Sequence, residues 1–213
     1  MENHELVSQI HSHCVDIKNR EIHLHSYVGD TDEDPGVDHR MIANFVKNIR
    51  LLENDNSKPI IIHMNSIGGD WSNGMAIYDS IRMCKSHVTI VVYSQAESMS
   101  SIILQAADKR VMMPHAYFMC HYGVSGHEGN YLDVQNWHRF EKTFTNTMLD
   151  IYAQVAMEGQ FFRNHYKQVT QEKVCNYIRR KLTKGDWFMN ANDAIYYGFA
   201  DEVISGSIDS LKV

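Results

Sequence analysis

The chain has 213 residues, of which 44% are hydrophobic, and this predicts one domain with an ample core. A net charge of −6 without a basic run argues against nucleic acid as a main partner. Four cysteines lie far apart with no C-x-x-C pair, which indicates neither a metal site nor a disulfide framework. With no signal-peptide pattern and no apolar stretch near the roughly 20 residues that span a bilayer, we expect a soluble, cytoplasmic chain without membrane contact.

The sequence predicts a single main domain with short extensions at both ends. Residues 1–20 are polar and are interpreted as an N-terminal arm that becomes ordered by contact with something else. The domain is expected to span residues 21–205, followed by a tail at 206–213. Residues 30–36 read as an acidic loop because they combine carboxylates with Pro and Gly.

Strand and helix patterns alternate along the first half of this domain. Apolar residues follow helical spacing at 42–52 and again at 76–83. Runs rich in β-branched residues predict strands at 60–64 and 88–93, with two more short strands around Pro114. This order predicts an α/β fold with parallel strand pairing.

One predicted helix is long for a domain of this size. Apolar residues recur at helical steps from Trp137 to Val155, and neither Gly nor Pro occurs between Tyr131 and Glu158. The pattern predicts a helix at about residues 131–158, roughly 40 Å long. Its apolar stripe is suited to burial against another copy of the chain, and packing on the chain's own core is the ordinary alternative.

The stretch from Gln95 to Ser101 separates the strand at 88–93 from a run of helix formers that begins at Ile102. Ser98 therefore sits where a strand meets a helix, with its hydroxyl exposed near the positive end of the helix dipole. Both conditions favour a nucleophile. The alternative is that Ser98 only caps the helix, which is a common role for serine.

Three further positions fit the partners that a nucleophilic serine requires. His121 ends an apolar strand before a glycine-rich loop, and Asp186 precedes the apolar Trp187. Gly68 and Gly69 follow a strand and offer backbone N–H groups for an oxyanion. Each has an ordinary alternative: a histidine bonded to backbone, a solvated turn aspartate and a tight turn without a ligand.

Four segments in this order resemble the ClpP-type (caseinolytic) serine peptidases, the barrel subunits of ATP-dependent proteases. Residues 65–69 (NSIGG) resemble the family's N-S-P-G-G turn, and residues 74–79 (GMAIYD) match the helix after it. Residues 95–99 (QAESM) resemble the nucleophile segment Q-A-A-S-M, and residues 186–198 resemble the family's D-x-F-M-S-A ending. The Ser, His, Asp order and spacing agree as well.

The resemblance implies a crotonase-like fold of ββα repeats with a protruding handle helix. It implies that Ser98 is the nucleophile, His121 the general base and Asp186 the carboxylate that orients it. Backbone N–H groups of Gly69 or Gly68, together with that of Met99, would hold the oxyanion. The implied activity is that of a serine endopeptidase that needs no metal or cofactor, because ATP is used by the partner unfoldase.

The resemblance also implies an assembly and a mode of substrate binding. The handle helix would interlock two heptameric rings into a tetradecamer, which would receive unfolded polypeptides from an AAA+ unfoldase of the Clp type. The glycine-rich loop would align an extended substrate strand. The residues expected to do so are Gly123, Val124, Ser125 and Gly126.

The chain departs from the family pattern close to the site. Ile67 replaces a proline, and Ser94 and Ser100 stand in place of glycines. Ser100 is expected to narrow the space behind the nucleophile, and Glu97 to weaken the base if its carboxylate lies near His121. His63 and Met83 stand where the family often has aromatic residues that line its unfoldase-docking groove, and these changes fit a phage-encoded or otherwise divergent member.

Two alternative functions follow. Ile67, Glu97 and Ser100 are compatible with a catalytically weak or inactive subunit that builds a mixed barrel. A crotonase-type acyl-CoA enzyme would share the fold and its paired backbone N–H groups, but that function leaves the triad motifs unexplained.

Overall fold

The computed structural model of the chain describes residues 3–25 and 36–212, so the predicted acidic loop lies outside the described residues except for Gly36. Within this range the helices are α1 (Asn3–His13), α2 (His39–Asp55), α3 (Trp71–Arg82), α4 (Met99–Leu104), α5 (Tyr131–Ala156), α6 (Gln160–His165), α7 (Gln171–Leu182), α8 (Ala191–Tyr197) and the 3-10 helix η1 (Ile208–Lys212). The strands are β1 (Val15–Asp16), β2 (Glu21–His25), β3 (Ile60–Ser66), β4 (Val88–Glu97), β5 (Lys109–Met112), β6 (Tyr117–Cys120), β7 (Trp187–Asn190) and β8 (Glu202–Val203).

The strands form one mostly parallel sheet, as the alternating pattern predicts. Its main path runs β1-β2-β3-β4-β5-β8, and among the strands of residues 3–25 and 36–212 only the β1–β2 and β6–β7 pairs are antiparallel. Strand β4 divides the sheet, because its first half pairs with β5 and its last residues pair with β6. The β4 end that leads into α4 therefore lies beside β6 and not beside β5.

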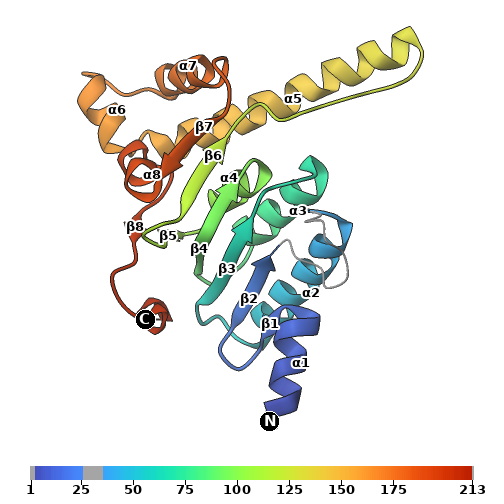
Figure 1. Ribbon diagram of the computed structural model, residues 1–213, viewed down its shortest axis with the longest axis vertical. Coiled ribbons are helices and arrows are strands. Elements are labelled where there is room, and N and C mark those ends of the chain that lie inside the picture. Colours follow the sequence, from blue (N-terminus) through green and yellow to red (C-terminus); the bar gives the residue numbers. More distant parts are fainter. Residues whose placement is uncertain (1–2, 26–35, 213) are drawn as a thin grey trace.

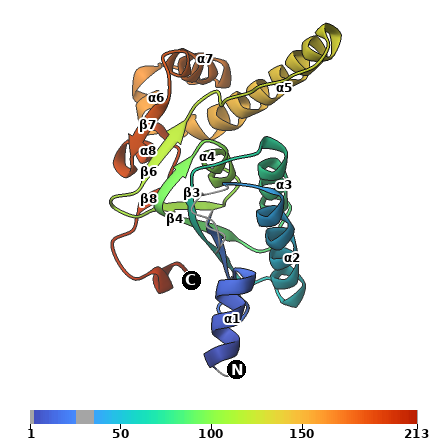
Figure 2. The same cartoon turned by 45° about the vertical axis from the view of Figure 1, so that its right-hand side comes forward.

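The two faces of the sheet have different coverings. Helices α2 and α3 lie side by side along one face (Figures 1 and 2), over a core cluster that includes Ile62 and Ile90. On the other face, Ile61 and Val91 belong to a smaller cluster that Leu211 of η1 completes. The period of two along β3 and β4 thus sends alternate residues into separate cores.

Helix α5 occupies the range in which one long helix is predicted. It has 26 residues, and its N-terminal half reaches away from the rest of the molecule (Figure 1). Its buried residues all lie in the second half, from Met148 to Ala156. In the described part of the chain no helix has the length and apolar character needed to cross a membrane.

The ends of the chain differ from the predicted arm and tail. Residues 15–16 form β1 and pair with β2, so the sheet begins within the segment interpreted as an arm. Arg20 is buried, and its guanidinium donates to the carbonyl of Leu52 at 2.7 Å. At the other end, Leu211 is buried against the sheet. Both short end segments are buried because they pack against an edge or a face of the sheet. The local sequence pattern does not reveal such long-range contacts.

Candidate active site

Ser98 occupies the single residue between β4 and α4. Its backbone is strained, with φ 50° and ψ −123°, a conformation that non-glycine residues seldom adopt outside functional sites. Its N–H donates to the carbonyl of Met119 at 2.9 Å, which fixes this turn to β6. The Ser98 hydroxyl makes no capping hydrogen bond to the helix, so the interpretation as a helix cap is wrong.

Strand register brings the other two candidates to this serine. Strand β6 pairs antiparallel with β7, and Cys120 is opposite Trp187. His121 directly follows β6 and Asp186 directly precedes β7, so the two residues come together just beyond this last pair. Parallel pairing of β4 with β6 then places Ser98 at the same end of the sheet.

The three side chains form a continuous hydrogen-bonded row. His121 Nε2 lies 2.8 Å from Ser98 Oγ, and His121 Nδ1 lies 3.2 Å from Asp186 Oδ1. With the ring proton on Nδ1, the imidazole donates to Asp186 and accepts from the Ser98 hydroxyl. This is the arrangement in which a histidine acts as general base towards a serine.

The neighbouring thiol does not compete with the serine. Cys120 is fully buried, and burial raises the pKa of its thiol well above the ordinary value. The reactive thiolate is therefore not formed near neutral pH.

Gly68 and Gly69 lie directly beside the Ser98 turn. Both have positive φ, 90° and 150°, and a Cβ on Gly68 would lie 2.7 Å from Ser98 Cβ and 2.8 Å from the Met99 nitrogen. Val37 holds this glycine turn, because its N–H donates to the Gly68 carbonyl at 2.6 Å and its carbonyl accepts from Asp70 at 2.9 Å. Glycine is required here for close approach and for the backbone conformation.

The two glycines differ in what their N–H groups can do. The Gly68 N–H donates to Ser66 Oγ at 3.3 Å, and Gly68 is not among the residues that line the cleft at Ser98. Gly69 and Met99 do line it. Met99 is the first residue of α4, so its N–H has no partner within the helix. Of the two donor pairs that the sequence left open, Gly69 with Met99 is the one the geometry favours.

Ser100 and Glu97, the departures from the family pattern closest to Ser98, each form a hydrogen bond with another side chain. The Ser100 hydroxyl is buried and donates to Ser66 Oγ at 2.7 Å, so it supports the glycine turn from below. The Glu97 carboxylate accepts a 2.7 Å hydrogen bond from the Tyr117 hydroxyl. This bond raises the pKa of Tyr117 to about 12.

The remaining departures lie outside the triad. Ile67 and Met83 are exposed, and so is Ser94 in the second half of β4. His63 is buried on β3. None of these four side chains lines the cleft at Ser98 among the residues that the structure describes.

A cleft of about 600 Å³ opens at Ser98 and His121. Its far wall is formed by α5, and Trp71 of α3 stacks on Phe144 of α5 with ring centroids 5.0 Å apart. Helical spacing predicts Phe144 on an apolar stripe, but no sequence pattern assigned Trp71 or α5 to the site. The position of Trp71, directly after the glycine turn, is the signal that was available.

The glycine-rich loop borders this cleft. Its residues 123–126 line the cleft, and Val124 is 97% exposed. No backbone hydrogen bond found in the described part of the chain involves these four residues. His127 stacks on Trp137 with centroids 5.0 Å apart, which ties the loop to α5. The loop thus presents unpaired backbone groups along the cleft.

Comparison with known proteins gives the family. The family model described as Clp protease matches residues 32–207, which is most of the chain. The chain belongs to the Clp protease family. The triad, the glycine turn and the cleft all lie within the matched range.

Curated relatives in this family carry one description. A protein of Deinococcus radiodurans named "ATP-dependent Clp protease proteolytic subunit" is 30% identical over 171 residues, which cover 79% of this chain and 76% of the relative. A Synechococcus protein, "ATP-dependent Clp protease proteolytic subunit 3", is 31% identical over 80% of this chain and 77% of its own length. A Carsonella ruddii protein with the first name is 28% identical over 88% and 85%.

Proposed function

We propose that this Clp protease family chain is the serine endopeptidase subunit of a ring-shaped, self-compartmentalised protease. The observation that carries the proposal is the row from Ser98 through His121 to Asp186, beside a glycine turn that faces the strained serine. The names of the curated relatives support the same reaction class.

Each residue has a role in acyl transfer. His121 Nε2 takes the proton from Ser98 Oγ, which attacks the peptide carbonyl and forms a tetrahedral intermediate. Backbone N–H groups of Gly69 and Met99 stabilise its oxyanion. The imidazolium then protonates the leaving amine, and water hydrolyses the acyl-enzyme by the reverse sequence. Asp186 keeps the ring oriented throughout. This mechanism uses no metal or cofactor.

The substrate is an extended, unfolded polypeptide. A peptide strand can add to residues 123–126 through main-chain hydrogen bonds, because the backbone of that loop is unpaired. Such binding depends little on sequence, which suits the degradation of many proteins.

The assembly we propose is a tetradecamer of two heptameric rings. The exposed apolar side chains on the projecting half of α5 support it, since a large unpaired apolar surface is typical of an interface. They are Tyr131, Leu132, Trp137 and Phe140. We propose that an AAA+ unfoldase of the Clp type delivers substrates to this assembly in the cytoplasm. For the fold, we propose the crotonase-like arrangement of ββα repeats.

A fluorophosphonate probe tests the catalytic proposal directly. We expect the assembled wild-type protein to become labelled at one serine, and Ser98→Ala to remain unlabelled. Ser94→Ala is a matched control, because Ser94 is exposed on the same strand and lies outside the cleft. Undiminished labelling of Ser98→Ala, or no labelling of the wild type, would show that the assignment is wrong.

The alternative of a weak or inactive structural subunit makes a different prediction in the same assay. It rested on Ile67, Glu97 and Ser100, and the contacts of Glu97 with Tyr117 and of Ser100 with Ser66 favour activity over that alternative. Assembled rings without labelling would support it. Turnover of acyl-CoA without peptide cleavage would instead support a crotonase-type enzyme.

A further inference from the structure

Three potential metal ligands converge on the sheet face that α2 and α3 do not cover. His23 of β2 is directly opposite His63 of β3 in the parallel register, and Glu21 lies two residues before His23 on the same face. One ligand atom from each of Glu21, His23 and His63 lies within 4.8 Å of the others. These residues take no part in the site at Ser98.

Two details of the cluster favour a bound cation. The Nε2 atom of His23 is buried without a hydrogen-bond partner in the described structure, which is a costly state for a polar atom. His63 Nε2 lies 3.1 Å from Glu21 Oε2, while His63 Nδ1 lies 2.9 Å from the Tyr93 hydroxyl. With the proton on Nε2, the first contact is a hydrogen bond to Glu21; with the proton on Nδ1 and donated to Tyr93, the Nε2 lone pair and the carboxylate are available as two ligands.

We propose that Glu21, His23 and His63 bind one divalent transition-metal ion, with Zn²⁺ as the representative. Two imidazole nitrogens and one carboxylate oxygen are a donor set that Zn²⁺ takes in proteins. Tyr93 would be the outer partner of His63, because a ligating histidine usually has its second nitrogen in a hydrogen bond that fixes the tautomer.

The ligand atoms must move slightly closer together to bind one ion. Two ligand atoms on one Zn²⁺ ion lie about 3.4 Å apart, given bonds of about 2.1 Å and tetrahedral angles. The His23 and His63 rings are stacked with centroids 4.7 Å apart, so one ring must rotate to bring its nitrogen closer. Strand pairing keeps the two backbones fixed while this happens.

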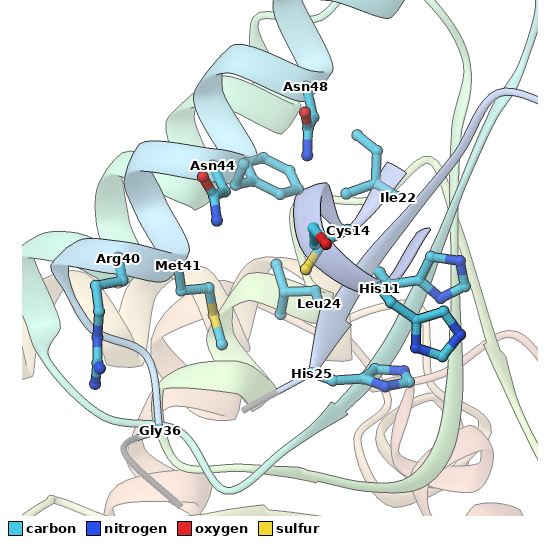
Figure 3. A pocket seen from close by; sticks show the side chains of 13 residues that line it. His11, Cys14, Ile22, Leu24, His25, Gly36, Arg40, Met41, Asn44 and Asn48 are labelled. Atoms are coloured by element: carbon cyan, nitrogen blue, oxygen red, sulfur yellow. The ribbon is translucent and has the colours of Figure 1, made fainter. Parts of the chain in front are cut away.

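Glu21 and His23 are half-buried, so an ion and a water as fourth ligand can reach the cluster from solvent. A separate pocket of about 350 Å³ lies between β2, α1 and α2; His11, His23 and His25 line it, but Glu21 and His63 do not. Figure 3 shows His11 and His25 at the same end of this pocket. His25 also contacts His23 edge to face, with centroids 5.8 Å apart. Three protein ligands at a half-buried position leave one tetrahedral coordination position for water.

Such an ion would link β2 to β3 and stabilise the folded state, because the unfolded chain does not present the three ligands together. The proposal is independent of the catalytic function, and its readout is metal binding.

Titration calorimetry of the metal-stripped protein with Zn²⁺ tests the proposal, together with the absorption spectrum of the Co²⁺ form. We expect one equivalent to bind with a Kd below about 10 µM, a Co²⁺ spectrum typical of four ligands and a rise in Tm. His23→Gln and His63→Gln should each weaken binding roughly 100-fold, since changes to outer partners alone cost about 10–100-fold.

Two variants separate this site from other histidines. His138→Gln removes an exposed His–Glu pair on α5, and His121→Gln removes the triad imidazole; both should bind Zn²⁺ as the wild type does. Wild-type protein without an equivalent of tight binding would overturn the proposal. So would wild-type affinity in folded His23→Gln and His63→Gln. If either variant fails to fold, the stoichiometry and Co²⁺ spectrum of the wild type decide.

Discussion

The Ser100 hydroxyl donates to Ser66 Oγ at 2.7 Å, and Ser66 Oγ in turn accepts from the Gly68 N–H. This short chain of hydrogen bonds joins the first turn of α4 to the glycine turn beside the nucleophile. A residue expected to crowd Ser98 instead supports the backbone that faces it.

Removal of this support should cost stability and reactivity together. In Ser100→Ala the buried Ser66 hydroxyl loses a donor, so we expect the free energy of unfolding to fall by about 1–2 kcal/mol. The fluorophosphonate labelling of Ser98 should slow several-fold because the glycine turn is less well held. Ser94→Ala should stay within about 0.5 kcal/mol of the wild type. Faster labelling at unchanged stability would restore the interpretation that Ser100 narrows the site.

Asp186→Asn should impair catalysis without unfolding the protein. The amide N–H2 can donate to His121 Nδ1 and so favours the tautomer protonated on Nε2, which cannot accept the Ser98 proton, and the amide lacks the charge that stabilises the imidazolium; the change is worth on the order of 10⁴-fold in kcat. Asp186 is 53% exposed at its side chain, which limits the cost to folding. Peptide hydrolysis by this variant and by Asp79→Asn, an exposed carboxylate on α3, gives the comparison. Equal rates would remove Asp186 from the triad.

Gly69→Ala should disturb the backbone beside Ser98, whereas Gly126→Ala should leave the fold unchanged. A Cβ on Gly69 would lie 2.5 Å from the Val37 nitrogen and 2.6 Å from its oxygen, at φ 150°, so Gly69→Ala should displace the oxyanion donor. A Cβ on Gly126 meets nothing within 4 Å. We therefore expect Gly69→Ala to lose peptide hydrolysis at least 100-fold, as for loss of one oxyanion donor. Gly126→Ala should keep wild-type Tm. Full activity in Gly69→Ala would exclude the proposed donor pair.

The Tyr117–Glu97 bond predicts a loss of stability at alkaline pH. The Glu97 hydrogen bond raises the pKa of Tyr117 from 10.0 to about 12, because it needs the protonated phenol. Because the folded-state pKa is raised, the hydrogen bond contributes its full share to the free energy of unfolding below pH 10. This contribution is lost as pH rises towards 12. Urea unfolding across this window should show a steeper decline for the wild type than for Tyr117→Phe. Other tyrosines, Tyr177 among them, also have a raised pKa, so the difference between the two proteins is the readout. Parallel curves would exclude this coupling.

The projecting half of α5 should determine assembly. Phe140 is 52% exposed there, and Phe140→Asp places a charge in the surface proposed to be covered by another copy. We expect wild-type protein to sediment as a large oligomer and the variant as smaller species. Asn146→Asp adds the same charge at an exposed polar position of α5. A wild-type monomer of 24.6 kDa with full activity would contradict the proposed ring.

The triad was within reach of the sequence, because residue order and local motifs report which residues end strands. The sequence could not show which way the side chains near Ser98 point. Whether the Ser98 hydroxyl turns to the helix or to His121 depends on one strained φ, and whether Glu97 faces His121 depends on pairing with β6. The choice of Gly69 over Gly68 likewise required a view of Ser66.

The histidine cluster was missed for a related reason. No strand was predicted at residues 21–25, although Ile22 and Leu24 alternate there as buried residues. The expectation of no metal site rested on cysteine spacing, which carries no information on histidines of two strands. Only the β2–β3 register places His23 opposite His63.

Helix α5 both lines the cleft, from Trp137 to Met148, and extends beyond the body of the chain. A continuous helix is stiff, so a displacement of its projecting end is transmitted to the part of the helix that lines the cleft. In the proposed assembly, the neighbouring copy that holds the projecting end of α5 would therefore also hold the wall of the cleft at Ser98. If the rings form as proposed, the reactivity of Ser98 should rise with the concentration of the chain.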